Sequence, residues 1–320
     1  MSLSVKNLFK RYGNIWALKD VSFEAVSGEI TGIFGSNASG KTTLLKVLAG
    51  NESSSGGTIS FDDEDVTKLS PSQRDFSLHT ESSPKGLRSV FRPAETSNNH
   101  DLAALEKAID DADRVLLLDE PFRKMDDHAR EAFGVRIRQI IKDKNLTIII
   151  ATARYEEIFN VCDRVAVLTD LQIRQQGTPQ EVYDRPASVA VATIVGRNNI
   201  FDSRRLTSSK SDHPEFLTLE GEHRLFAEKA DIKTLGAITK NVSLAIRPEN
   251  ISISFGASFP EDNLLKAVVR GVKPRGPSTL VELDSNGLKL EAMVLRLVGL
   301  NIGDECMIGL PPDRIQVLPD

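Results

Sequence analysis

A glycine-rich run, GSNASGKT at residues 35–42, has the residue types and spacing needed to hold a chain of phosphates. Gly35 and Gly40 allow the backbone to turn tightly, so that its N–H groups point at phosphate oxygens, and a following helix adds its positive end. Lys41 would reach the β- and γ-phosphates, and the Thr42 hydroxyl would bind Mg²⁺. We therefore expect a nucleotide site made by Gly35, Ser36, Asn37, Ala38, Ser39, Gly40, Lys41, Thr42 and Thr43.

The flanking residues argue against the alternative, a glycine-rich turn that arose by chance. Residues 29–34 (EITGIF) are apolar and β-branched, which predicts a strand. Residues 41–48 predict a helix, with Leu44, Leu45 and Leu48 spaced along one buried face. Strand, turn and helix in this order are the context that a phosphate-binding loop requires.

A second candidate for chemistry is RVLLLDEP at residues 114–121, a predicted buried strand that ends in two acids. Asp119 would hold Mg²⁺ through water, and Glu120 would polarise an attacking water molecule. The alternative is a strand that simply ends in a charged turn. Because the phosphate-binding loop lies upstream in the same chain, we favour a hydrolytic site.

Apolar segments that alternate with helical patterns predict a mostly parallel α/β sheet. Short alternating segments at residues 3–5 and 21–23 predict antiparallel strands near the N-terminus. The remaining expected elements are strands at residues 115–118, 147–151 and 165–168 and helices at residues 102–110 and 128–142.

From about residue 196 the helical periodicity fades, and short alternating segments separated by turn residues replace it. Several short strands at this spacing predict a small barrel or sandwich. The polar run at residues 203–214 is expected to be a loop or linker. We therefore expect two domains, residues 1–196 and residues 197–320.

The composition of the 320 residues excludes several classes of protein. Forty per cent hydrophobic and 27 per cent charged residues are typical of a folded soluble chain, and a net charge of −5 offers no basic excess for nucleic acid. No run of 18 apolar residues suggests a membrane span, and the first residues lack the apolar core of a signal peptide. The two cysteines have no metal-binding spacing. We expect a cytoplasmic protein with reduced thiols.

Several segments resemble the ATP-binding subunits of ABC importers, the group that serves maltose, polyamines, iron, sulfate and molybdate. Residues 9–30 are similar to the family's opening, in which an aromatic residue stacks on adenine. Tyr12 has that place, and the alternative is a partly buried surface tyrosine. Residues 162–186 follow the family pattern, and IRPENISIS at residues 246–254 resembles its transport-associated (TOBE) β domain. The resemblance implies an ABC-ATPase-like P-loop NTPase, α/β with a mostly parallel sheet, followed by a small all-β OB-like barrel.

The sequence departs from this family at four places. Glu81 stands where the family has a glutamine, although its carboxylate could still contact Mg²⁺. Only 14 residues separate Glu81 from Thr96, too few for the family's helical subdomain. Residues 95–99 (ETSNN) stand in place of the signature LSGGQ, and Ala153 stands in place of the switch histidine. Because one preorganised donor supplies about 10²–10³ in rate, we expect slow turnover.

The resemblance implies binding of ATP and Mg²⁺, with Glu120 as the catalytic base and Thr42, Asp119 and Glu81 at the metal. It further implies an ATPase that energises permease subunits from the cytoplasmic face of the membrane, as a homodimer or with another ATPase subunit, and that binds no nucleic acid. The alternative is a weak or inactive nucleotide-binding regulatory partner. A soluble ABC ATPase without a transport role is disfavoured by the C-terminal domain. That domain is shared by importers of many solutes, so the sequence does not identify the solute.

Overall fold

The computed structural model describes residues 2–80, 112, 114–123, 125–207, 213–235, 237–254, 263–295 and 299–319. The chain divides into two compact units, Met1–Asp184 and Arg185–Asp320. The expected domain boundary, after residue 196, falls inside the second of these units, beyond helix α7 (Val189–Ile194). None of the helices within the described residues is long and apolar enough to cross a membrane.

The first unit begins with a four-stranded antiparallel sheet in the order β2-β1-β4-β5. Its first two strands form a long hairpin in which Val5 lies opposite Phe23, so the antiparallel strands predicted near the N-terminus are confirmed. Leu3, Val5 and Phe23 are buried, as the alternation of apolar residues requires for one face of the sheet. The four strands are β1 (Ser2–Tyr12), β2 (Ile15–Val26), β4 (Gly56–Phe61) and β5 (Glu64–Asp65).

The second sheet of this unit has six strands in the order β10-β9-β3-β8-β7-β6. Five of them are parallel, and β10 is antiparallel to β9. The predicted mostly parallel α/β sheet is therefore confirmed. The strands are β3 (Ile30–Phe34), β6 (Phe76–Thr80), β7 (Val115–Asp119), β8 (Thr147–Thr152), β9 (Arg164–Thr169) and β10 (Gln172–Gly177).

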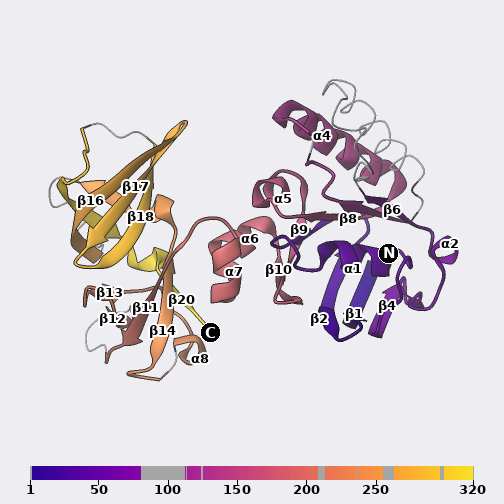
Figure 1. The fold of residues 1–320 in the computed structure, drawn as a ribbon, viewed down its shortest axis with the longest axis horizontal. Helices are drawn as coiled ribbons and strands as arrows, with labels where there is room; N and C mark the ends of the chain where they lie inside the picture. The colour runs from indigo at the N-terminus through magenta and orange to yellow at the C-terminus, as the bar shows by residue number, and fades with distance from the viewer. Residues whose placement is uncertain are drawn as a thin grey trace. The chain divides into compact units, whose positions relative to one another are not determined.

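Helices pack on this sheet from both sides (Figure 1). Helix α1 (Lys41–Leu48) has the predicted bounds, and its apolar side joins the core formed with both sheets. Helix α5 (Tyr155–Val161) lies so close to β3 that a Cβ on Gly32 would come within 2.4 Å of Ile158 Cδ1. The expected helix at residues 102–110 and the short connection at residues 82–95 lie outside the described residues. The other helices are α2 (Pro71–Arg74), α4 (Asp127–Lys144) and α6 (Pro179–Asp184).

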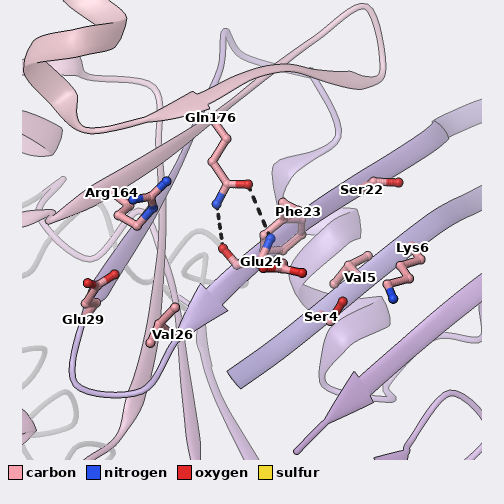
Figure 2. Close-up of a pocket in the computed structure, with 10 residues that line it drawn as sticks. All are labelled: Ser4, Val5, Lys6, Ser22, Phe23, Glu24, Val26, Glu29, Arg164 and Gln176. Carbon is pink, nitrogen blue, oxygen red and sulfur yellow. Dashed lines mark hydrogen bonds between the residues drawn. The ribbon is translucent and has the colours of Figure 1, made fainter. Parts of the chain in front are cut away.

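The two sheets are joined at one edge by the side chain of Gln176 (Figure 2). Its amide accepts a hydrogen bond from the backbone N–H of Glu24 (3.4 Å) and donates one to the Glu24 carbonyl (2.6 Å), as a neighbouring strand would. A cavity of about 450 Å³ lies at this seam and is lined in part by Glu29 and Arg164. It is separate from the predicted nucleotide loop, which follows the other end of β3.

The second unit is an all-β domain in which two five-stranded sheets share one apolar core, so the predicted class is confirmed. Its described residues also include one further short α-helix, α8 (Ile232–Leu235), and two 3-10 helices, η2 (Pro248–Asn250) and η3 (Pro312–Arg314). The first sheet is made by β11 (Asn199–Arg205), β12 (Glu215–Thr218), β13 (Arg224–Phe226), β14 (Asn241–Ile246) and β20 (Gln316–Leu318). The second is made by β15 (Ser252–Ser254), β16 (Asn263–Arg275), β17 (Ser278–Ser285), β18 (Leu288–Val294) and β19 (Glu305–Leu310).

The start of the predicted linker at residues 203–214 is wrong, because residues 203–205 belong to strand β11. Two inward positions of this strand, Asn199 and Ser203, are polar, so the hydrophobic alternation is weak. Both side chains are buried and satisfied by hydrogen bonds, from Ser203 Oγ to the Val242 carbonyl and from Asn199 Nδ2 to the Ile246 carbonyl. Internal hydrogen bonds thus replace the apolar contacts that sequence patterns detect.

Candidate nucleotide-binding site

The expected site residues follow the carboxyl ends of three neighbouring strands. Strand β8 lies between β3 and β7, with Phe34 opposite Thr152 and Asp119 opposite Ala151. The backbone N–H of Glu120 donates to the Ala151 carbonyl at 2.8 Å, which ties the end of β7 to the end of β8. In parallel α/β sheets this edge is where ligands bind. The sheet therefore brings together the phosphate-binding loop and the acidic pair.

Both fixed glycines of the loop are required by its geometry. A Cβ on Gly35 would lie 2.3 Å from the Leu168 carbonyl oxygen and 2.6 Å from Ser39 Oγ. Gly40 has a φ of 104°, and a Cβ there would lie 2.6 Å from the Ala17 carbonyl oxygen. Gly40 immediately precedes α1, so its left-handed backbone turns the loop into the helix.

Lys41 is folded back over the loop that it follows. Its Nζ donates to the carbonyls of Gly35 (2.8 Å) and Ser36 (3.0 Å) and lies 3.7 Å from Glu120 Oε1. Burial lowers the pKa of Lys41, while the charges of Glu120 and Asp119 oppose that shift. The ammonium group therefore lies between the loop carbonyls and Glu120. Its expected contact with the β- and γ-phosphates stays a prediction.

Two buried polar atoms in this region have no hydrogen-bond partner. They are Ser39 Oγ in the loop and Asp119 Oδ1 at the end of β7, and both residues are 8% exposed. An unpaired buried oxygen is costly unless a ligand satisfies it. A carboxylate oxygen is a ligand that Mg²⁺ prefers, so Asp119 fits a magnesium site. Thr42, the second residue of α1, is exposed and leaves its hydroxyl accessible.

Glu120 is held in an unusual backbone conformation. Its φ is 50°, in the left-handed region that a glutamate rarely adopts and that costs of order 1 kcal/mol or more. Burial raises the pKa of its carboxyl group, the charge of Lys41 opposes this, and the charges of Glu157 and Asp119 add to the rise. A carboxylate whose pKa is raised is a stronger base, as a general base for water requires.

The structure adds two residues that the sequence did not single out, Thr152 and Glu157. The Thr152 side chain is fully buried, and its Oγ1 lies 2.5 Å from Glu157 Oε2 and 3.5 Å from Glu120 Oε2. Glu157, in the first turn of α5, is only 4% exposed. At the position expected for the switch histidine, the backbone N–H of Ala153 opposes the rise in the pKa of Glu120. The sequence signal that could have identified Glu157 is a glutamate on a helix face whose other residues are apolar and buried.

Tyr12 lies beside helix α1, as its expected role requires. Its hydroxyl donates to Glu52, whose carboxylate lies 3.9 Å from Lys46 Nζ in the last turn of α1. The ring is 46% exposed, and Lys10 Nζ lies 4.8 Å from its centroid. An exposed ring held by its hydroxyl leaves a face on which a flat base can stack.

Two of the sequence-based expectations fall on residues that the structure does not describe. Glu81, the third expected metal ligand, is one of them, although the preceding strand β6 ends with Thr80 opposite Asp119. The signature position at residues 95–99 is the other. The described site therefore comprises the loop, Tyr12, Asp119, Glu120 and the Thr152–Glu157 pair.

Sequence comparisons place two family models on the chain. The model described as ABC transporter matches residues 18–111, and the model described as TOBE domain matches residues 244–318. A sulfate/thiosulfate import ATP-binding protein, CysA, from Nocardia farcinica is 32% identical over 232 residues, which cover 61% of this chain and 70% of the relative. A spermidine/putrescine import ATP-binding protein, PotA, from Trichormus variabilis is 28% identical over 358 residues, which cover 100% of this chain and 89% of the relative.

Comparison with solved structures supports the same fold for the first unit. The nucleotide-free ATP-binding cassette of an ABC transporter superposes with a TM-score of 0.52 at 18% identity, over 62% of this chain and 100% of the cassette.

A sulfate/thiosulfate import ATP-binding protein, CysA 2, from Shewanella oneidensis extends the sequence similarity to nearly the whole chain. It is 28% identical over 356 residues, which cover 96% of each protein.

Proposed function

Because the chain belongs to the ATP-binding subunits of ABC importers that carry a C-terminal TOBE domain, we propose that it binds Mg·ATP at residues 35–43 and hydrolyses it with Glu120 as the base. The observation that carries this proposal is the arrangement of Lys41, Asp119 and Glu120 at one edge of the sheet. Lys41 lies 3.7 Å from Glu120, beside the two unpaired oxygens of Ser39 and Asp119. Tyr12, next to α1, would stack on the adenine.

The chain's own residues account for binding of the triphosphate. The loop N–H groups and the start of α1 would hold its oxygens, and Lys41 would leave the loop carbonyls to contact the β- and γ-phosphates. Thr42 and Asp119 would hold Mg²⁺, with Glu81 as a further oxygen ligand. When bound, Mg²⁺ neutralises part of the phosphate charge beside the two acids.

Hydrolysis follows from the position of Glu120 next to Lys41. Glu120 accepts a proton from water as the water oxygen bonds to the γ-phosphorus and the bond to the β–γ bridging oxygen breaks, which yields ADP and phosphate. Because Ala153 has no imidazole, we still expect slow turnover from the isolated protein. The alternative of a regulatory partner that does not act as an ATPase is not favoured, since the relatives are import ATP-binding proteins.

Titration with a fluorescent ATP analogue tests binding. The wild type should show saturable binding that Lys41→Ala abolishes, whereas Lys68→Ala, an exposed lysine in the same unit, should leave it unchanged. Phosphate release should then fall in Glu120→Gln while the analogue still binds. Absence of wild-type binding up to millimolar ligand would disprove the proposal.

We further propose that the chain works on permease subunits at the cytoplasmic face of the membrane, as a homodimer or with a second ATPase subunit. The support is its similarity to import ATP-binding proteins over nearly its whole length. Relatives named for sulfate/thiosulfate and for spermidine/putrescine are equally similar, so either solute class fits. Cross-linking in the cells that make the protein should capture it with integral membrane proteins, and capture with soluble proteins alone would contradict this role.

A further inference from the structure

Glu157 is a buried carboxylate at the start of helix α5, where the helix dipole favours negative charge. It lies in the first turn of α5 and is 4% exposed. Its Oε1 makes no hydrogen bond and lies 3.5 Å from Nε of Arg154, whose side chain is 48% exposed. A buried charge is expensive unless it is well paired. The role of this carboxylate therefore depends on which groups it contacts.

The partner that Glu157 does engage is the hydroxyl of Thr152. The distance from Thr152 Oγ1 to Glu157 Oε2 is 2.5 Å, and the same hydroxyl lies 3.5 Å from Glu120 Oε2. The backbone N–H of Arg154 donates to Thr152 Oγ1 at 3.1 Å. A threonine hydroxyl has one proton to donate. Two carboxylates therefore compete for that proton, and the shorter distance assigns it to Glu157.

This competition matters because Glu120 is otherwise fully constrained. Its backbone has a φ of 50°, its N–H is bonded to the Ala151 carbonyl, and its Oε1 lies 3.7 Å from Lys41 Nζ. A hydrogen bond from Thr152 would occupy a lone pair of Glu120 Oε2 that a water molecule could otherwise use. Holding the Thr152 proton elsewhere keeps that lone pair free.

We propose that Glu157 is a positioning residue that binds the hydroxyl proton of Thr152 and so keeps Oε2 of Glu120 free to accept a proton from water. The inference rests on the proposed function, because it assigns Glu120 as the base. In this chain Ala153 has no side-chain donor, and the proposal gives a role at Glu120 to the neighbouring residues at the end of β8 and the start of α5. Neither Thr152 nor Glu157 touches substrate in this scheme.

The test uses the full-length protein and variants that separate the acceptor from the charge. Glu157→Met removes the acceptor at similar length, so Thr152 should turn its proton to Glu120. Glu157→Gln retains an acceptor oxygen and should behave like the wild type. Glu156→Gln, at the exposed neighbouring position, is the matched control. Adding Thr152→Val to Glu157→Met removes the hydroxyl proton that would otherwise bind Glu120. The double variant should therefore recover the behaviour of the wild type.

Two readouts are needed. The first readout is the ¹³C NMR chemical shift of the Glu120 carboxyl group in protein labelled with carboxyl-¹³C-glutamate; the signal is assigned by its loss in Glu120→Gln. In nucleotide-free protein this chemical shift should change in Glu157→Met and return to the wild-type value in the double variant. Turnover per bound nucleotide should fall about tenfold in Glu157→Met, a part of the 10²–10⁴ that a general base supplies. The affinity for the ATP analogue should change less than about threefold, because the change acts through Glu120 and not through the phosphate-binding loop.

The outcomes separate this inference from the proposed function. An unshifted Glu120 signal in Glu157→Met, or a double variant that is no closer to wild type than Glu157→Met, overturns the positioning role. Failure of the wild type to bind the ATP analogue refutes the proposed function instead. The carboxyl signal decides the positioning role even if the isolated protein turns over too slowly to measure.

Discussion

Arg74 supports the helix that carries the phosphate-binding loop, and its replacement should destabilise the first unit strongly. It is the last residue of α2 and is 2% exposed. One guanidinium nitrogen, Nη1, donates to the carbonyls of Val47 and Leu48, each at 2.7 Å, at the C-terminal end of α1. The Val47 carbonyl also accepts the backbone N–H of Gly50 at 3.1 Å. Nη2 donates to Thr67 at 2.6 Å, and Nε donates to Leu69 at 3.0 Å.

The magnitude follows from these contacts. Arg74→Met keeps much of the volume but removes the cation at the helix C-terminus, a contribution of up to about 2 kcal/mol. It also removes the Arg74 donor from the buried Leu48 carbonyl, at about 1–3 kcal/mol, and from the part-buried carbonyls of Thr67 and Leu69. Because such terms are not additive and water can reach some of the carbonyls, we expect a loss of about 4 kcal/mol in the free energy of unfolding, within the range for breaking a buried charged contact.

Urea unfolding followed by tryptophan fluorescence measures this loss. Trp16 is the only tryptophan of the chain and lies in β2, so the signal reports the first unit. With a slope of about 2–3 kcal/mol/M, the midpoint should fall by about 1.5–2 M. Arg138→Met, which removes a half-exposed pair with Asp163 (2.8 Å), is the control and should shift it little. A shift for Arg74→Met no larger than that of Arg138→Met would refute this account of the helix end.

Further predictions concern the loop glycine and the thiols. Gly40→Ala should weaken binding of the ATP analogue and lower the free energy of unfolding by about 1–3 kcal/mol through strain and the clash with the Ala17 carbonyl. Gly28, also in the first unit, has a φ of 84°, but a Cβ there would meet only Asn145 Oδ1, at 3.5 Å, so Gly28→Ala should cost less in the same assay. Equal effects would contradict the clash argument. Burial raises the pKa of Cys162 and of Cys306, so both thiols should be unreactive in the folded protein. A thiol reagent at neutral pH should therefore label neither cysteine before unfolding and both cysteines in urea. Rapid labelling of the folded protein would show that one thiol is accessible.

Local sequence patterns predicted most of the elements in the first unit. The helix at residues 41–48 and the strands that became β3, β7, β8 and β9 were predicted because their apolar residues recur at the period of each element. The strand β11 was largely missed, since its buried Asn199 and Ser203 are satisfied by hydrogen bonds to distant strands. Such partners cannot be identified from a short stretch of sequence, because they lie on another strand of the same sheet or in the second sheet of the domain.

The sequence by itself determined the phosphate-binding loop, because glycines at two positions, a lysine and a hydroxyl form a contiguous motif whose backbone requirements are local. It also determined that Asp119 and Glu120 end a buried strand. Only the tertiary structure decided which groups surround Glu120. Strand β8 inserts between β3 and β7, and this places Thr152 and Glu157 next to an acid more than 30 residues away in the chain. Neighbours across a parallel sheet depend on strand order, which local spacing does not encode.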